Sequence, residues 1–168
     1  RLHVYVLMTN HYHLLLETPE PNLSRAMQWL NVSYSVWFNR RHQRSGHLFQ
    51  GRFKAIVVDQ DEWALALSRY VHLNPVRVAS LGLGKDDRQR QQAGASEKPD
   101  AELVRKRITL LRAYRWSSYL AYIGAAKVPE WLECGTVLAM GDARHAARQN
   151  AYQTYVEDAI REGLAESP

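Results

Sequence analysis

The sequence predicts an α+β domain in which helices pack on an antiparallel sheet, and three observations indicate this class. Residues 1–8 alternate apolar with polar side chains, and residues 11–18 suit the second arm of a hairpin. Residues 23–41 repeat apolar side chains at spacings of three and four, as an amphipathic helix does. A third strand at 46–59 and a second helix at 61–74 follow, so the expected order is strand, strand, helix, strand, helix.

Local signals mark where these elements begin and end. Thr9 and Asn10 are expected to form a turn between the first two strands. Pro19 stops the second strand, and Asn22 is well placed to cap the helix that follows. Pro75 ends the second helix, because the residue before a proline is disfavoured in the α region.

The rest of the chain is predicted to be a polar insert followed by helices. Residues 82–101 contain almost nothing that a core could bury, so we expect a flexible insert there. A basic helix is expected at 101–113 and a terminal amphipathic helix at 142–164. We therefore divide the chain into a core at 1–81, the insert, and a helical region at 102–168 that packs on the core or extends it.

Charge and composition narrow the class of protein. The chain of 168 residues is long enough for one domain with a buried core. A net charge of +5 and a pI of about 9.5 favour a polyanionic partner, although many basic proteins have none. No apolar run approaches the length of a membrane span, and the first residues lack the features of a secretory signal. The single Cys134 cannot form an internal disulfide, which favours a reducing compartment and hence the cytoplasm.

Two histidines separated by one residue lie in the second predicted strand. Side chains two apart on a strand share a face, so His11 and His13 can reach one point. Tyr12, Leu14 and Leu16 are expected on the opposite, buried face. Alone, such a pair is more often structural than metal-binding; its place on a strand favours a metal site, because imidazole accepts many divalent metals.

Tyr70 and Asn74 supply a second pair of polar groups on the predicted helix at 61–74. Residues four apart share a helix face, so a phenol and an amide oxygen can be presented together. Taken alone, Tyr70 would be an interfacial aromatic residue and Asn74 would merely end the helix. With the histidine pair, the amide oxygen would complete a metal site that prefers Mg²⁺ or Mn²⁺ to structural Zn²⁺.

These four residues suit the breaking and rejoining of a phosphodiester. A phenol is a weak nucleophile at neutral pH because its ordinary pKa is about 10, so it needs a base or an activated electrophile. A metal on the scissile phosphate would neutralise charge and orient the phosphate for in-line attack. The covalent phosphotyrosine preserves the bond energy for resealing, which favours strand transfer over simple hydrolysis.

Polar and basic side chains near these segments form a plausible track for phosphates. Singly, each is more typical of a solvated surface. The candidates for contact with DNA are Arg40, Arg41, Gln50, Arg52, Lys54, Arg69 and Arg77. Trp116 and Tyr119 are candidates for base stacking, with core packing as the alternative.

Three runs resemble the REP-associated tyrosine transposases, which are single-tyrosine transposases of the HUH endonuclease superfamily. They are Val-Leu-Met-Thr-Asn-His-Tyr-His-Leu-Leu-Leu-Glu-Thr-Pro, Gly-His-Leu-Phe-Gln-Gly-Arg-Phe-Lys and Arg-Tyr-Val-His-Leu-Asn-Pro-Val-Arg. Arg-Trp-Ser-Ser-Tyr at 115–119 also resembles a segment of that family. The likeness covers residues 1 to about 80 and 113 to about 132.

The resemblance implies a ferredoxin-like antiparallel sheet and a role for each of the four residues. His11 and His13 would be the metal-binding HUH pair, Asn74 the third ligand, and Tyr70 the nucleophile. The implied cofactor is Mg²⁺ or Mn²⁺, and the implied partner is single-stranded DNA folded into imperfect hairpins such as repetitive extragenic palindromes. Such proteins have a further strand and helix before the hairpin, which this sequence lacks, and a shorter insert than the one at 82–112.

Two other functions remain open from the sequence. The chain could be a regulatory nucleic-acid-binding protein that keeps the fold without productive cleavage. It could also be a metal-dependent hydrolase of small phosphoesters in which Tyr70 takes no part.

Overall fold

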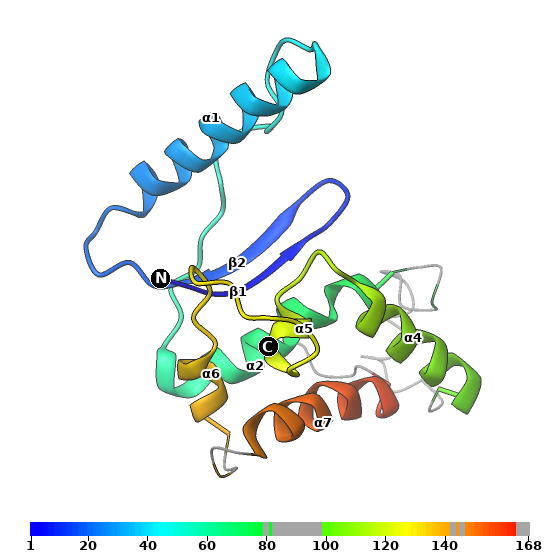
Figure 1. The fold of residues 1–168 in the computed structure, drawn as a ribbon. Helices are drawn as coiled ribbons and strands as arrows, with labels where there is room; N and C mark the ends of the chain where they lie inside the picture. Colours follow the sequence, from blue (N-terminus) through cyan, green and yellow to red (C-terminus); the bar gives the residue numbers. More distant parts are fainter. Residues whose placement is uncertain (79–80, 82–98, 142–143, 145–146, 164–168) are drawn as a thin grey trace. The chain divides into compact units, whose positions relative to one another are not determined.

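Strands β1 (Leu2–Leu7) and β2 (Tyr12–Leu16) form an antiparallel hairpin, as expected (Figure 1). The computed structural model describes residues 1–78, 81, 99–141, 144 and 147–163. The Met8 N–H donates to the His11 carbonyl at 2.8 Å, so Thr9 and Asn10 form the predicted turn. The chain divides into two compact units, one of residues 1–17 with 59–168 and the other of residues 18–58.

The register of the hairpin decides which face of the sheet is buried. Val6 pairs with His13, and residues opposite each other in such a pair lie on the same face. Val4 and Val6 are completely buried, whereas Tyr12, Leu14 and Leu16 are only half-buried. The expectation that these three residues of β2 would face the core is therefore wrong. Helix α2 (Gln60–Leu73) packs against both strands and covers the valines on the histidine side instead.

Helices make up most of the remainder of this first unit. Helix α2 continues into the 3₁₀ turn η1 (Asn74–Val76), which contains Pro75. The later helices are α4 (Ala101–Ala113), α5 (Tyr119–Tyr122), α6 (Gly135–Ala139) and α7 (Arg148–Arg161). Helix α4 has the predicted bounds and begins after Asp100, whose side chain accepts from the Leu103 N–H at 2.7 Å. Residues 82–98 of the predicted insert lie outside the described residues.

One hydrophobic core joins the hairpin to the C-terminal helices. Its fully buried side chains come from β1, α2, η1, α4, α5, α6 and α7, and they include Val4, Val6, Leu73, Val76, Leu111, Tyr119, Tyr122, Val137, Val156 and Ile160. The α+β class with C-terminal helices is confirmed, and it is consistent with a ferredoxin-like fold reduced to two strands over the described residues.

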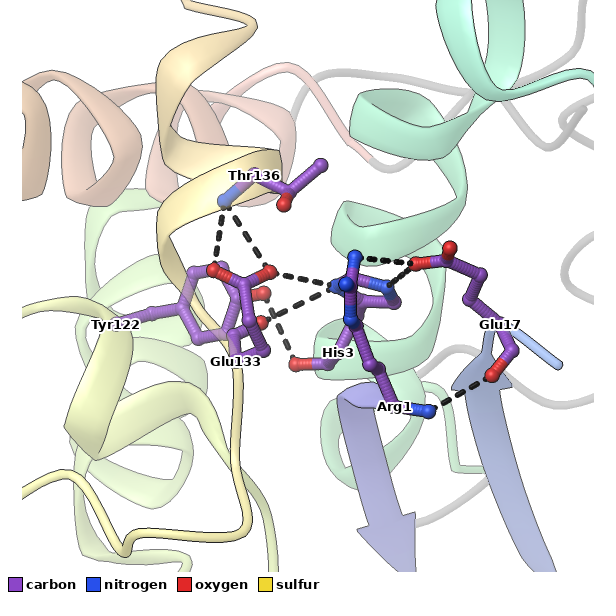
Figure 2. Close-up of polar contacts among 6 residues, drawn as sticks. All are labelled: Arg1, His3, Glu17, Tyr122, Glu133 and Thr136. Carbon is purple, nitrogen blue, oxygen red and sulfur yellow. Dashed lines mark hydrogen bonds and ion pairs between the residues drawn. The ribbon is translucent and has the colours of Figure 1, made fainter. Parts of the chain in front are cut away.

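A polar cluster around His3 anchors the start of β1 (Figure 2). The Nδ1 of His3 lies 2.9 Å from a Glu133 carboxylate oxygen, and its Nε2 lies 3.4 Å from Glu17. The Tyr122 hydroxyl donates to the His3 carbonyl at 3.0 Å. The two carboxylates contact opposite nitrogens of the His3 ring, so the ring lies between them. They therefore do not point at a common position where a metal ion could bind. The cluster therefore joins the start of β1 to the end of β2 and to the segment before α6.

The predicted third strand is absent from the described structure. Residues 43–59 contain no strand, and Val57 is 100% exposed. A strand is stable only when a neighbour satisfies its backbone hydrogen bonds, and the hairpin does not pair with this segment. On the outer edge of β1 the backbone pairs with residues near Ser117 and Leu132 instead.

The second unit consists of helix α1 (Leu23–His42) and the loop after it. The helix begins where expected, although the Asn22 side chain makes no capping hydrogen bond. Met27 is its buried residue, and its other apolar side chains are not buried, which contradicts the expectation of a stripe facing a core. The loop returns along the helix, and the Asn39 side chain donates to the Gly46 carbonyl at 2.9 Å.

Two further features concern the apolar character of the helices and the chemistry of Cys134. Among the described residues, no helix has both the length and the apolar character needed to cross a bilayer. Cys134 is a free, buried thiol, and burial raises its pKa to about 12, so it stays protonated and unreactive at neutral pH.

Candidate active site

The site forms where the turn end of the hairpin meets helix α2. The rings of His13 and Tyr70 meet edge to face, with centroids 6.1 Å apart and planes at 85°. The rings of His11 and His13 are also edge to face, with centroids 5.1 Å apart. Three of the four predicted residues are thus brought together within one unit, although 57 positions separate His13 from Tyr70 in the sequence.

His11 lies one residue before β2 and is oriented by its neighbour in the turn. Its Nδ1 is 2.7 Å from the Oδ1 of Asn10. An amide oxygen can only accept, so Nδ1 carries the proton and Nε2 keeps its lone pair. Histidine ligands of metals are usually held in this way, with one ring nitrogen bonded to a nearby acceptor. Asn10 was predicted only as part of the turn. Its position next to His11 in the sequence was the signal that could have indicated this orienting contact.

His13 is half-buried, and its environment favours the neutral ring. Burial lowers its pKa, and the neighbouring His11 lowers it further. A neutral imidazole offers the lone pair that a metal requires, whereas a protonated one repels a cation. His11 therefore fits a cation ligand by the orientation of its ring, and His13 by its neutral state.

Asn74 is at the C-terminal end of α2, on the face that Tyr70 occupies. Its amide nitrogen donates to the carbonyls of Tyr70 at 3.0 Å and Val71 at 3.3 Å. These bonds occupy the nitrogen and leave Oδ1 as the available donor atom for a cation. The structure records no contact that joins Asn74 to either histidine, so its role as third ligand stays a prediction. No cluster of three or more His, Cys, Asp or Glu side chains suited to a metal occurs in the described part of the chain. A third ligand beside the two histidines would therefore have to be another type of group, such as an amide oxygen.

The predicted DNA-binding residues fall into two groups. In the first unit, the Arg77 guanidinium lies over the Tyr70 ring, 4.8 Å from its centroid, and is nearly buried. Arg69 lies over the ring of Tyr155 in α7 at 4.3 Å. The second unit holds the exposed residues Arg40, Arg41, Gln50, Arg52 and Lys54. Arg77 is therefore the basic residue that the structure places in contact with Tyr70.

The two aromatic candidates for base stacking differ in their exposure. Tyr119 is completely buried, and its hydroxyl donates to Glu157 at 3.1 Å, so the core-packing alternative is correct for it. Trp116 is 53% exposed, and the Arg115 guanidinium lies 4.7 Å from its ring centroid. The Leu7 N–H donates to the Trp116 carbonyl at 2.8 Å, which places this exposed indole beside β1.

His72 also belongs to this region, and no sequence pattern assigned it a role. It is completely buried in α2, and each ring nitrogen has a hydrogen-bond partner. Ser68 is one helical turn earlier and is also completely buried. The spacing of Ser68 and His72, two polar residues four apart on one helix face, was the sequence signal that could have indicated a buried polar network.

Comparison with known proteins found a likeness in the part of the chain that holds these residues. Residues 1–74 match the family model described as "Transposase IS200 like". This segment is similar to transposases. The match spans both histidines, Tyr70 and Asn74 but covers 74 of the 168 residues, so α4 to α7 lie beyond it. No curated protein and no solved structure matched the chain.

Proposed function

We propose that this chain is a metal-dependent endonuclease and strand transferase of single-stranded DNA that acts through Tyr70. The observation that carries the proposal is the edge-to-face contact between His13 and Tyr70 at 6.1 Å. It supplies a nucleophile beside a candidate metal ligand, in a segment similar to IS200-like transposases.

The reaction would proceed by covalent catalysis. The phenolic oxygen of Tyr70 attacks the scissile phosphorus, the bond from phosphorus to the 3′ oxygen breaks, and the strand leaves with a 3′-hydroxyl. The phenolic proton passes to solvent, and the departing oxygen takes up a proton. The product is a 5′-phosphotyrosine. In the second step another 3′-hydroxyl attacks that phosphorus and releases Tyr70, so the number of phosphodiester bonds is conserved.

His11, His13 and Asn74 would hold the divalent cation, Mg²⁺ or Mn²⁺. The donor set fits, because both imidazoles can present a lone pair and the Asn74 nitrogen is already bonded to its own helix. When bound, such an ion supplies charge neutralisation at the scissile phosphate. Arg77 adds a positive charge over the Tyr70 ring, which favours an anionic substrate near this residue.

The proposed substrate is hairpin-forming single-stranded DNA, such as repetitive extragenic palindromes. A net charge of +5 supports a polyanionic partner. The exposed Trp116 beside β1 offers a flat surface of the kind on which unpaired bases stack.

The experiment is a covalent-adduct assay with a labelled hairpin oligonucleotide and Mg²⁺ or Mn²⁺. Wild-type protein should give a denaturation-resistant adduct that EDTA prevents. Tyr70→Phe should abolish the adduct and retain DNA binding, because the phenyl ring keeps the contact with His13. His11→Ala should reduce the adduct in a way that more metal partly restores. An adduct that persists in Tyr70→Phe would refute the proposed nucleophile.

The same assay separates the two alternative functions. DNA binding with no metal-stimulated nicking would select a regulatory binding protein. Hydrolysis of a small phosphodiester that is lost in His11→Ala but kept in Tyr70→Phe would select a hydrolase.

A further inference from the structure

A buried chain of hydrogen bonds passes through His72, on the opposite side of α2 from the site. The Nδ1 of His72 is 2.7 Å from the Tyr152 hydroxyl of α7, and its Nε2 is 2.7 Å from the Ser118 hydroxyl. His72 is completely buried and both of its partners are hydroxyl groups, so the ring is neutral and carries one N–H. The Tyr152 hydroxyl donates to Ser68 at 2.8 Å, so it accepts from Nδ1–H. Nε2 then accepts from Ser118.

Both ends of this chain are satisfied by backbone groups. The Ser68 hydroxyl donates to the Leu65 carbonyl at 2.6 Å. At the other end, the Ser118 hydroxyl accepts from the Tyr5 N–H of β1 at 3.0 Å. The Ser118 hydroxyl lies 3.2 Å from the Tyr5 carbonyl, which already accepts from the Ser118 N–H at 3.0 Å. Its contact with Nε2 of His72 is shorter, at 2.7 Å, so the hydroxyl proton is assigned to His72. The network therefore ties α2 to β1 and to α7 with no member lacking a partner.

The network sets the rotation of α2 about its axis. Residues two apart on a helix point about 200° apart, so the position of His72 on one side of α2 sets the direction in which Tyr70 points on the other side, toward His13. The hairpin is fixed to the same network through Tyr5, which is next to Val6, the pairing partner of His13. A rotation by one residue, about 100°, would break the bonds of His72 and carry Tyr70 away from His13.

We propose that His72 is a positioning residue, and that α7, through the Tyr152 hydroxyl, anchors α2 so that Tyr70 stays opposite His13. This assigns part of the catalytic geometry to a helix beyond the segment that matches the IS200-like model. The expected change in the rate of adduct formation rests on the proposed function. The expected change in the anchoring of α2 does not.

The test compares two buried tyrosines that each lose only a hydroxyl. Tyr152 and Tyr119 both pack their rings on His72, with centroids 5.7 and 5.5 Å away. The Tyr152 hydroxyl bonds to His72 and Ser68, whereas that of Tyr119 bonds to Glu157 of α7. Tyr119→Phe is therefore a matched control for the loss of a buried hydrogen bond.

Both variants are assayed in full-length protein, each at the same interval below its own thermal midpoint. In Tyr152→Phe, the single-turnover rate of adduct formation at saturating hairpin DNA should fall about tenfold to a hundredfold, because a small misplacement of a reacting group has effects of this size. The dissociation constant for DNA should stay within about twofold, and Tyr119→Phe should keep both values. Equal losses of rate in the two variants would overturn the proposal, since stability alone would explain them.

Amide hydrogen exchange gives a readout that does not depend on catalysis. Residues 70–73 of α2 should exchange faster in Tyr152→Phe than in Tyr119→Phe. Ser118→Ala, which cuts the same chain on the side of β1, should show the same pattern if Tyr152→Phe is too unstable to assay. Unchanged exchange at 70–73 in both network variants would overturn the anchor. If Tyr70→Phe still forms an adduct, the proposed nucleophile fails, and the exchange data still decide the role of the anchor.

Discussion

Glu157 and Arg112 form a two-pronged ion pair that joins α7 to α4. The guanidinium Nε and Nη2 each lie 2.8 Å from a different carboxylate oxygen. The Glu157 side chain is almost fully buried, while that of Arg112 is partly exposed. The carboxylate also accepts from the Tyr119 hydroxyl at 3.1 Å, so α7 is attached to the core by its charge as well as by its apolar face.

Arg112→Ala should lower the free energy of unfolding by about 1–3 kcal/mol, because it removes the hydrogen-bonded guanidinium from a buried carboxylate and leaves only Arg161, 3.6 Å away, as a charged partner. Urea unfolding followed by circular dichroism measures the change. Arg105→Ala on the exposed face of the same helix is the control and should have an effect within about 0.5 kcal/mol. Similar losses in the two variants would show that the ion pair contributes little.

Asn10→Ala should weaken Mn²⁺ binding about tenfold, because the His11 ring loses the acceptor that fixes its tautomer and orientation. Titration followed by electron paramagnetic resonance of free Mn²⁺ measures the affinity. Asn22→Ala is the control, since the Asn22 side chain makes no capping hydrogen bond. An unchanged affinity in Asn10→Ala would mean that Asn10 does not orient the metal ligand.

Stability should fall as the pH drops from 6.5 towards 5, because burial lowers the pKa of His72 from 6.5 to about 3. In this window the unfolded chain takes up a proton that the folded protein excludes, so the slope reaches about 1.4 kcal/mol per pH unit. His13, whose pKa is also lowered, contributes with the same sign. The pKa values of Glu133 and Glu157 lie below 4.5, so their loss of stability begins at lower pH.

Urea unfolding at pH 7 and at pH 5 measures how the free energy of unfolding changes with pH. The NMR shifts of the imidazole protons show which histidine takes up the proton. The His72 ring should show no titration down to pH 5. A His72 midpoint near the ordinary value of 6.5 would contradict both the burial and the direction of the hydrogen-bond chain.

Asp100→Ala should destabilise the protein by about 1 kcal/mol, because the first turn of α4 loses the acceptor of its Leu103 N–H. Asp100→Asn should recover most of this loss, since an amide oxygen can accept the same hydrogen bond. Thermal unfolding of the three proteins measures the order. If Asn were no better than Ala, the cap would not contribute to stability.

Local patterns were sufficient where a feature depends on residues close in sequence. The Thr9-Asn10 turn follows from chemistry within a few positions, and so do the start of α1 at Leu23 and the bounds of α4. The placement of His11 and His13 together follows from the strand period. Asn22 shows the limit of such signals, because its preference for a cap did not produce the capping bond.

Only the tertiary structure decided what is buried and what pairs. The valines of β1 share the face of His13 because α2 packs there, and the segment at 46–59 stays out of the sheet because no strand pairs with it. His72 is the centre of a buried network that no local pattern could predict, because its partner Tyr152 lies 80 residues away. The strand and helix periods read from a sequence give the faces of each element; burial is decided by contacts between elements, which no local pattern contains.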